Sequence, residues 1–340
     1  MASPRLVFWL FLAFAALLPT QQARSEDALV DLLVSVPSPL NLTYLPIDLI
    51  TKIGADKAEG ARVKVRHFGG GGVALKEMAS RNVDFAVAGM PAAMSLKANG
   101  GDVVVVAAVS AAPLFIFMVR ADLQNTVKEV GDLKGKLIGV NTSSLTSKTT
   151  SQQLAELIMK SNGVMPDQFR IVPAGQSWEA QSEVLTNGRV DAIMGDEPFA
   201  SRLLAANKVY FLVNLADSEQ AKKIPGAGFL HAALETRSEV IKTDPHKVEK
   251  MVLIIKRTLQ WMSQATPEQI IDTLEVQDPE DKRWLLASLQ KYPKMYSRDG
   301  RLSAAQLQET ARFFQESSPE AAARLNLGEL INDRWAGKKE

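Results

Sequence analysis

The sequence contains no cysteine and no excess of charge of either sign. Without cysteine the chain forms no disulfide and no thiolate metal site, has no cysteine nucleophile and offers no cysteine for lipid attachment. Its 39 basic and 38 acidic residues give a net charge of +1, and no run of Lys or Arg forms a basic stripe, so nucleic-acid binding is not expected. A composition that is 46% hydrophobic and 23% charged is typical of a folded protein, and 340 residues suffice for about two domains.

Long apolar runs are also scarce, and the clearest one, Leu6–Leu18, lies near the N-terminus. At 13 residues it is shorter than the ~20 that a helix needs to span a bilayer, which argues against the alternative of a membrane anchor. Arg5 precedes the run, and Ala23 and Ser25 are small residues at positions −3 and −1 of a cleavage site. We therefore expect a cleaved secretory signal peptide over residues 1–25 and a soluble, periplasmic mature protein that begins near Glu26.

An internal repeat with a constant offset of 107 positions is the most informative pattern. The segment Ser80–Pro91 aligns without a gap on Asn187–Pro198, and Val63–Phe68 aligns on Arg170–Gly175. In each copy a helix ends, the chain turns, and a short apolar strand runs to a proline. The simplest interpretation is one β-α-β unit in each half of the chain. Two such halves that face each other enclose a cleft, and in open α/β sheets ligands bind beyond the carboxyl ends of the strands.

The remaining segments predict an α/β fold of two lobes, each a mixed, mainly parallel sheet flanked by helices. Val103–Ser110 and Leu114–Arg120 are continuous apolar runs, typical of strands that are buried on both faces. From Ser238 onward only helices are expected. Because a lobe built from one continuous stretch cannot hold this tail and still close a symmetric cleft, we expect the chain to cross near Arg120–Asp122 and to return near Phe229–Glu235.

The predicted division of the chain follows from these two crossings. Residues 1–25 are the signal peptide, residues 26–120 form the first part of lobe 1, and residues 121–230 form lobe 2. Residues 231–340 return to lobe 1 with one strand, and the C-terminal helical tail packs on that lobe.

The run Gly69–Gly72 is the sharpest local signal for a binding site. Between a strand and a helix, consecutive glycines let the backbone approach a ligand and leave helix N–H groups free to bind an anion. The alternative is a flexible turn. It is not a nucleotide phosphate loop, because no Gly-Lys-Ser/Thr follows it. The equivalent loop of the other half, Gln176–Trp178, is polar and aromatic at a predicted helix start.

Side chains at the other predicted loops can serve either as helix caps or as ligand contacts. Asn41 and Thr43 in the first half, and Thr142–Thr146 in the second, follow strands and precede helices. We expect at least one hydroxyl from each loop to reach the ligand. Trp178 is either a stacking platform for the ligand or a residue of the lobe core.

Asp196 and Glu197 are adjacent at the end of a predicted strand, so their side chains point to opposite sides and do not form a catalytic dyad. We expect one of the two carboxylates to accept from an amino or amide N–H of the ligand. The alternative is a cap on the helix that starts at Pro198.

The predicted ligand-binding residues lie at these loops and strand ends: Ser38, Asn41, Thr43, Gly70, Gly71, Gly72, Met90, Ser144, Thr146, Gln176, Ser177, Trp178, Asp196 and Glu197. No catalytic residue, metal site or cofactor is predicted. The histidines His67, His231 and His246 have no metal-ligand spacing, and no Ser-His-Asp set can be assembled from the sequence.

Several segments in this order resemble the exported solute-binding proteins of ABC importers, of the nitrate/sulfonate/taurine type, a group that includes carriers of the pyrimidine precursor of thiamine. The segments are Gly69–Leu75, Val83–Ala86, Asp132–Val140, Val190–Ala192 and Asp196–Phe199. The resemblance extends from about Val30 to Arg334. It implies a two-lobed periplasmic receptor that closes on a small molecule and delivers it to a permease in the inner membrane. An enzyme-like branch of the superfamily depends on a Cys-rich motif, and the absence of cysteine excludes that activity.

We therefore expect a monomeric, non-enzymatic receptor for a small polar organic molecule, a sulfonate or related anion. A receptor of the same fold that signals to a membrane sensor kinase remains an alternative. A secreted enzyme is disfavoured because no nucleophile, base or metal set emerges from the sequence. The predicted signal peptide and the lack of a helix-turn-helix argue against a cytoplasmic regulator.

Overall fold

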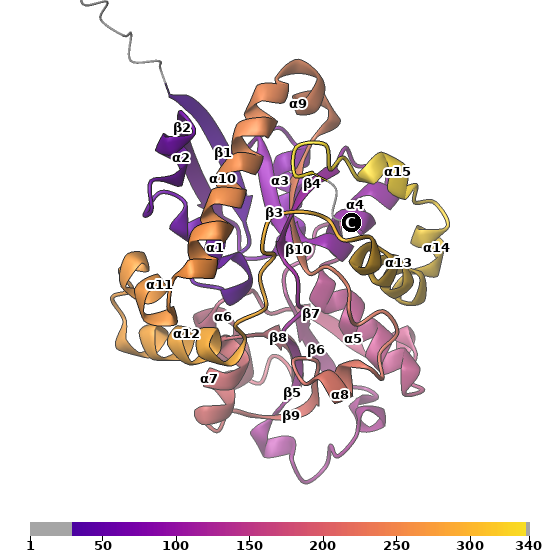
Figure 1. Ribbon diagram of the computed structural model, residues 1–340. Helices are drawn as coiled ribbons and strands as arrows, with labels where there is room; N and C mark the ends of the chain where they lie inside the picture. Colours follow the sequence, from indigo (N-terminus) through magenta and orange to yellow (C-terminus); the bar gives the residue numbers. More distant parts are fainter. Residues whose placement is uncertain (1–28, 338–340) are drawn as a thin grey trace, which may run out of the picture.

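The computed structural model describes residues 29–337, so the predicted signal peptide lies outside the described residues. Within this range the chain forms two five-stranded sheets, one above the other in Figure 1, each flanked by helices. None of the described helices combines the length and the apolar character that a membrane crossing requires. The predicted two-lobed α/β fold is therefore confirmed.

The first sheet has the strand order β2-β1-β3-β10-β4, in which only β10 runs antiparallel to its neighbours. Apart from the edge strand β2, several of whose residues are exposed, its strands are apolar and buried in the centre of the lobe, as expected for a sheet covered on both faces. The strands are β1 (Val30–Val36), β2 (Ala61–His67), β3 (Phe85–Gly89), β4 (Val104–Ser110) and β10 (Ala232–Thr236).

The second sheet repeats this topology in the order β7-β6-β8-β5-β9, with β5 as its antiparallel strand. Its strands are β5 (Phe115–Arg120), β6 (Leu137–Val140), β7 (Arg170–Pro173), β8 (Ala192–Asp196) and β9 (Val209–Asn214). The repeat of 107 positions is realised residue by residue: α3 (Gly71–Ala79) corresponds to α6 (Trp178–Thr186), and β3 corresponds to β8. Each repeat unit is a strand–helix–strand segment that contributes two strands to its own sheet: β2 and β3 in the first, β7 and β8 in the second.

The first crossing between the lobes lies earlier than the sequence predicts. Phe115–Arg120 was expected in lobe 1, but β5 pairs with β8 and β9 in the second sheet. The chain therefore crosses over residues 111–114, before the predicted crossing at Arg120–Asp122. The physical reason is that β4 and β5 are equally apolar and equally buried, so hydrophobicity does not reveal which sheet each strand joins. The return agrees with its predicted place, because β10 lies in the first sheet.

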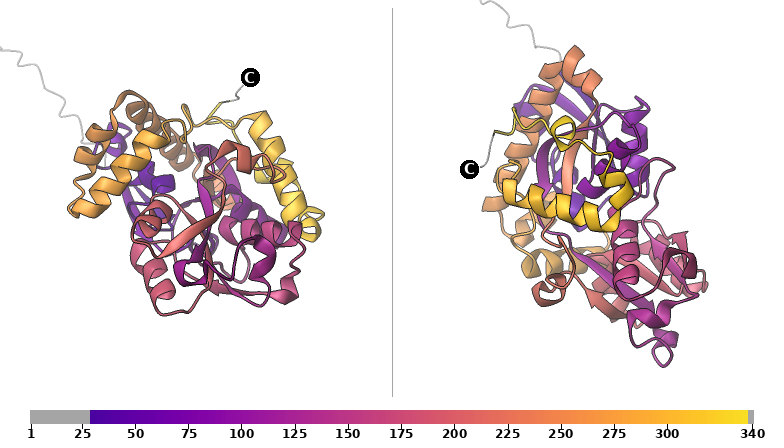
Figure 2. Two further views of the ribbon diagram at one scale, coloured as in Figure 1. Left: turned by 90° about the horizontal axis from the view of Figure 1, so that it is seen from below. Right: turned by 90° about the vertical axis from the view of Figure 1, so that its right-hand side faces the viewer.

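Helices surround both sheets, and the C-terminal ones pack on two sides of the first lobe (Figures 1 and 2). Those before the tail are α1 (Leu45–Leu49), α2 (Ala55–Ala58), α4 (Met90–Ala98), α5 (Thr150–Ser161), α7 (Phe199–Ala205) and α8 (Ser218–Ala221). Those of the tail are α9 (Ser238–Thr243), α10 (Pro245–Gln264), α11 (Pro267–Leu274), α12 (Pro279–Lys291), α13 (Ala304–Ser317), α14 (Pro319–Ala322) and α15 (Leu327–Leu330).

The longest tail helix, α10, shows why this segment is helical and where it packs. Pro245 lies in its first turn, and the side chain of Asp244 caps it by accepting from the amide of Lys247. Its buried residues recur at helical spacing, from Val248 to Leu259, and they pack against the strands of the first sheet. The tail therefore packs on the first lobe, as predicted.

Helix α13 connects the two lobes as well. Phe313 belongs to an apolar cluster of the second lobe and stacks on Phe229, with 4.5 Å between ring centres. The next residue, Phe314, belongs to a cluster of the first lobe. Two adjacent aromatic side chains thus attach one helix to both lobes.

Candidate functional site

The two lobes meet at the carboxyl ends of their strands, where a hydrogen bond joins them. Asn41 follows β1 in the first lobe and donates from Nδ2 to Oδ2 of Asp196, the last residue of β8, over 2.9 Å. Gln176, which follows β7, donates from Nε2 to the same oxygen, also over 2.9 Å. All three side chains are at most 2% exposed. Three of the predicted site residues thus converge on one buried carboxylate.

A short 3-10 helix, η1 (Leu42–Tyr44), fixes the orientation of Asn41. The side-chain oxygen of Asn41 caps this helix by accepting from the amide of Thr43 over 2.9 Å. The side-chain nitrogen is therefore free to reach the other lobe. Thr43 is buried in the same turn, and its carbonyl accepts from the Ser110 hydroxyl over 2.6 Å. Capping and contact across the cleft are combined in one Asn side chain.

The environment of Asp196 is unfavourable to its negative charge. Burial raises the pKa of Asp196 to about 6, and the hydrogen bonds from Asn41 and Gln176 oppose this rise only in part. Tyr44 is also buried here, and burial together with the nearby charge of Asp196 raises the pKa of its phenol above the usual value. Oδ1 of Asp196 has no hydrogen-bond partner. The site thus holds a desolvated carboxylate with one oxygen still to be paired.

Further buried polar atoms without a hydrogen-bond partner come from both lobes. Besides Asp196 Oδ1, they include Ser38 Oγ, Asn141 Oδ1, Thr150 Oγ1, His231 Nδ1 and Glu235 Oε1. Each buried polar group left unpaired costs ~1–3 kcal/mol, so native proteins rarely gather several of them in one place. Ser38 follows β1, Asn141 follows β6, and Thr150 is the first residue of α5. His231 precedes β10, and Glu235 lies in it. They therefore indicate a place where a ligand supplies the missing partners.

Short contacts show that these groups belong to one region. Thr150 lies against Gly89 at the end of β3, close enough that a Cβ on this glycine would clash with the threonine hydroxyl. His231 accepts with its carbonyl from the amide of Met90 over 2.8 Å. A carboxylate oxygen of Glu235 accepts from the amide of Ala88 over 3.0 Å. The strand ends of the first sheet and the start of α5 in the second lobe are thus in contact.

The glycine run forms part of this contact between lobes. A Cβ on Gly70 would clash with the backbone of Thr142, and one on Gly72 would lie 2.7 Å from the amide nitrogen of Ser144. Only glycine allows two backbones to approach so closely. At Gly71, by contrast, a Cβ would lie 3.8 Å or more from its neighbours, which is ordinary contact. The run therefore joins the lobes, and its expected contact with ligand stays a prediction.

Glu197 points away from Asp196, as expected for neighbours on an extended chain. Its carboxylate accepts from the amide and the hydroxyl of Ser201, over 3.0 and 2.7 Å, at the start of α7. It also accepts from the phenol of Tyr292 in the tail, over 3.2 Å. Of the two predicted roles, helix capping is the one for which the structure shows contacts at Glu197.

Trp178 occupies a packing position at the start of α6. Its partly buried ring packs beside an apolar cluster of the second lobe, and the guanidinium of Arg202 lies 4.1 Å from the ring centre. Arg202 in turn pairs with Asp281 of α12, across the two lobes. The packing alternative thus accounts for Trp178. Ser177, predicted as a ligand contact, caps α6 by accepting from the amide of Ala180 over 3.3 Å.

Three other predicted residues are not among the converging side chains. Met90 is fully buried in an apolar cluster of the first lobe, because the helix that it starts turns this face to the core. Thr146 is exposed, and Ser144 accepts within its own loop from the amide of Ser147. In place of these two hydroxyls, the second lobe presents Asn141 and Thr150. The predicted ligand contacts of Met90, Ser144 and Thr146 thus have no support from the side chains around Asp196 and stay predictions.

Sequence reasoning missed Tyr44, Asn141, Thr150, His231 and Glu235. Asn141 and Thr150 flank the loop of residues 142–146, which was predicted to contact the ligand. The end of β6 and the start of α5 are the sequence signals that could have identified them. His231 and Glu235 lie on the return strand, whose position beside β3 no local pattern reveals. The imidazole of His231 packs 4.8 Å from the ring of Phe115, and burial lowers the pKa of His231 to about 4.

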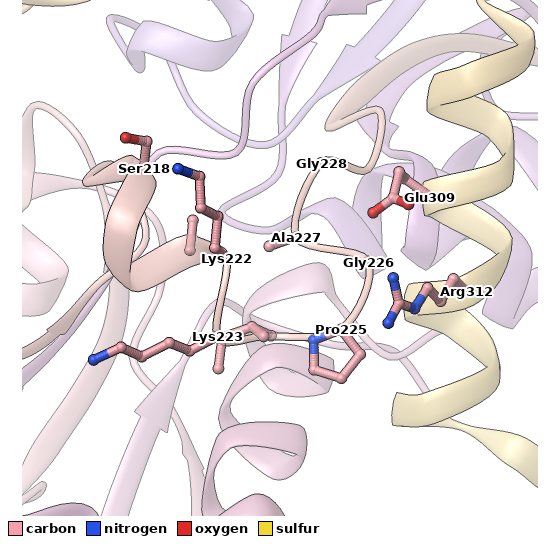
Figure 3. Close-up of a pocket in the computed structure, with 11 residues that line it drawn as sticks. Ser218, Lys222, Lys223, Pro225, Gly226, Ala227, Gly228, Glu309 and Arg312 are labelled. Atoms are coloured by element: carbon pink, nitrogen blue, oxygen red, sulfur yellow. The ribbon is translucent and has the colours of Figure 1, made fainter.

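A separate cavity of about 470 Å³ lies at the second crossing (Figure 3). Ser218 and residues 221–228 line one side, and Glu309 and Arg312 of α13 line the other. Another cavity, of about 540 Å³, lies between α10, α11, α12 and the loop that follows α12. Neither is lined by the side chains that converge on Asp196.

Comparison with known proteins identifies the class. The model of the NMT1/THI5-like family matches residues 57–270, and the chain belongs to this family. The fold is that of periplasmic binding proteins, as in the Candida albicans CA3427 product, with a TM-score of 0.68 at 14% identity over 90% of this chain and 96% of that one. No curated protein matches this sequence.

Two further solved structures have the same fold. A protein from Bordetella bronchiseptica RB50 superimposes with a TM-score of 0.80 at 20% identity and covers 92% of this chain and 96% of its own. The alkanesulfonate-binding protein SsuA from Xanthomonas axonopodis pv. citri, solved with bound MOPS, gives a TM-score of 0.69 at 15% identity over 89% and 98% of the two chains.

Proposed function

We propose that this protein is an exported, non-enzymatic receptor that captures a small polar organic molecule between its lobes and delivers it to an ABC-type permease. The observation that carries this proposal is the set of buried, unpartnered polar atoms that both lobes contribute around Asp196. A ligand bound there touches both lobes at once and holds them together.

The ligand-binding residues in this proposal are the hydrogen-bonded Asn41, Gln176 and Asp196 and the unpartnered Ser38, Asn141 and Thr150, with Gly70 and Gly72 closing the interface. The alkanesulfonate-binding neighbour supports the expectation of an organic sulfonate or related acid among the candidate ligands. No catalytic role is proposed for any of these side chains.

A thermal-shift screen of the mature protein against sulfonates, carboxylates, nitrate and pyrimidines tests the proposal. We expect one class to raise the melting temperature and to bind with one molecule per chain in calorimetry. Binding that is unchanged in a variant with Asn41→Ala and Gln176→Ala, with the fold intact by circular dichroism, would place the ligand outside this site.

A further inference from the structure

We infer that the ligand presents an N–H donor to Asp196, and that an anion without such a donor is not the natural ligand. This inference rests on the proposed function and specifies the chemistry of the same site. Among sulfonates, only those that also carry an amino group remain candidate ligands. Amines, amidines and amino-substituted heterocycles are candidates as well.

The hydrogen bonds of Asp196 carry the first step. Oδ2 already accepts from Asn41 and Gln176, each over 2.9 Å, whereas Oδ1 is buried without a partner. A carboxylate oxygen accepts hydrogen bonds and does not donate them. A ligand group that satisfies Oδ1 must therefore be a donor, and a sulfonate or nitrate oxygen cannot fill this role.

Other polar atoms of the site are also buried without a hydrogen-bond partner. Asn141 Oδ1 is an amide oxygen and can only accept, whereas burial raises the pKa of Glu235, so that its neutral carboxyl can donate as well as accept. The hydroxyls of Ser38 and Thr150 can donate or accept. Asp196 Oδ1 and Asn141 Oδ1 therefore require donors from the ligand, whereas the hydroxyls and the Glu235 carboxyl can pair with either kind of atom.

Charge provides the third step. Within residues 29–337 the only buried Lys or Arg is Arg237, which donates to the carbonyl of Val83 over 2.7 Å, and burial lowers the pKa of the buried His231. Arg237 follows the end of β10 that lies away from Asp196, because β10 begins at the lobe junction. No buried cation of the described chain therefore balances Asp196. A positively charged ligand group would supply that balance, whereas a second negative charge would be repelled.

The experiment compares probes of similar size that carry or lack an N–H donor, with the charge changed as well in the first two pairs: 2-aminoethanesulfonate against ethanesulfonate, benzamidine against benzoate, and 4-aminopyrimidine against pyrimidine. We expect the melting temperature to rise with a donor-bearing member and not with its counterpart. For that probe, Asp196→Asn should weaken binding in calorimetry by about 10- to 100-fold, the range expected for a lost hydrogen bond to a charged group.

Asp191→Asn is the matched control, because Asp191 precedes the opposite end of β8 and accepts there from the amide of Leu137. It should leave the affinity unchanged, and circular dichroism checks that both variants fold. A donor-free anion that binds the wild type and Asp196→Asn equally well would overturn the inference. If that anion also compacts the protein in small-angle scattering, the proposed receptor function stands. A probe that binds without any compaction contradicts the proposed function itself.

Discussion

Asp196 and His231 are buried titratable side chains whose pKa values shift in opposite directions at the lobe junction. Burial raises the pKa of Asp196 to about 6 and lowers that of His231 to about 4. Neutral Asp196 therefore stabilises the fold in acid, and this contribution is lost as the pH rises from its unfolded pKa, near 4, through 6. Neutral His231 stabilises the fold above pH 6.5, and this contribution is lost as the pH falls through 4.

The two contributions oppose each other in the wild type, so single variants must separate them. Between pH 4 and 7 the free energy of unfolding of Asp196→Asn, relative to the wild type, should increase by about 2 kcal/mol, because one pKa unit corresponds to ~1.4 kcal/mol, Asp196 of the unfolded chain is already partly ionised at pH 4, and Asn does not titrate. Urea unfolding across this pH range gives the measurement. A difference that stays constant with pH would show that Asp196 keeps an ordinary pKa.

At the scale of elements, the loop before α3 and the loop before α5 meet backbone to backbone. Gly72→Ala should weaken ligand binding by about 10-fold or more, because its Cβ would lie 2.7 Å from the amide nitrogen of Ser144 in the closed arrangement. Gly71→Ala is the matched control, since a Cβ there has ordinary space. Both substitutions should preserve helix content, because alanine is the better helix former. Equal affinities for the two variants would contradict the role of this contact.

Helix α13 offers a second test at this scale. Phe313→Ala should destabilise the protein by about 3–5 kcal/mol, the usual cost of truncating a buried aromatic side chain. With an unfolding entropy of ~2.1 cal/mol/K per residue, this corresponds to a fall of roughly 5–8 °C in melting temperature. Calorimetry measures the fall, and an exposed helix-surface substitution such as Gln308→Ala serves as the control. A change below 1 °C for Phe313→Ala would mean that α13 does not hold the second lobe.

The repeat units show how much of the fold a single sequence reveals. The pairs α3 with α6 and β3 with β8 were predictable because each unit is local and its apolar pattern recurs at a fixed offset. The place of Asp196 at the lobe junction was predictable because this residue ends a recognised strand. The sheet that β5 joins was not predictable from the sequence. The positions of His231 and Glu235 were not predictable either, because both depend on pairings between strands far apart in the sequence.

At the scale of the molecule, closure of the lobes on a ligand should appear in stability and in shape together. A ligand at ~100 times its dissociation constant that binds only the folded form stabilises it by about 2.7 kcal/mol. For a chain of this length that is a rise of roughly 4 °C in melting temperature. Small-angle scattering should show a smaller radius of gyration in the presence of the same ligand. A melting shift without compaction would contradict the closing mechanism.

Export is the other prediction at this scale. Expressed from its full sequence in a Gram-negative host, the protein should be recovered from the periplasm with an N-terminus near Glu26. Cell fractionation and N-terminal sequencing decide this. Recovery of the intact Leu6–Leu18 segment on membrane-bound protein would refute the signal peptide.

The position of β10 between β3 and β4 has a consequence for the order of synthesis. The strands of the second sheet all come from residues 115–214, so this sheet can form as soon as that stretch is available. The first sheet stays in two unconnected pieces until residues 232–236 emerge, because β10 alone bonds to both β3 and β4. At ~5–20 residues per second, the ribosome needs on the order of ten seconds to get from β4 to β10. During that interval the nascent chain cannot complete the first sheet, so its N-terminal lobe folds only after the second sheet has been synthesised.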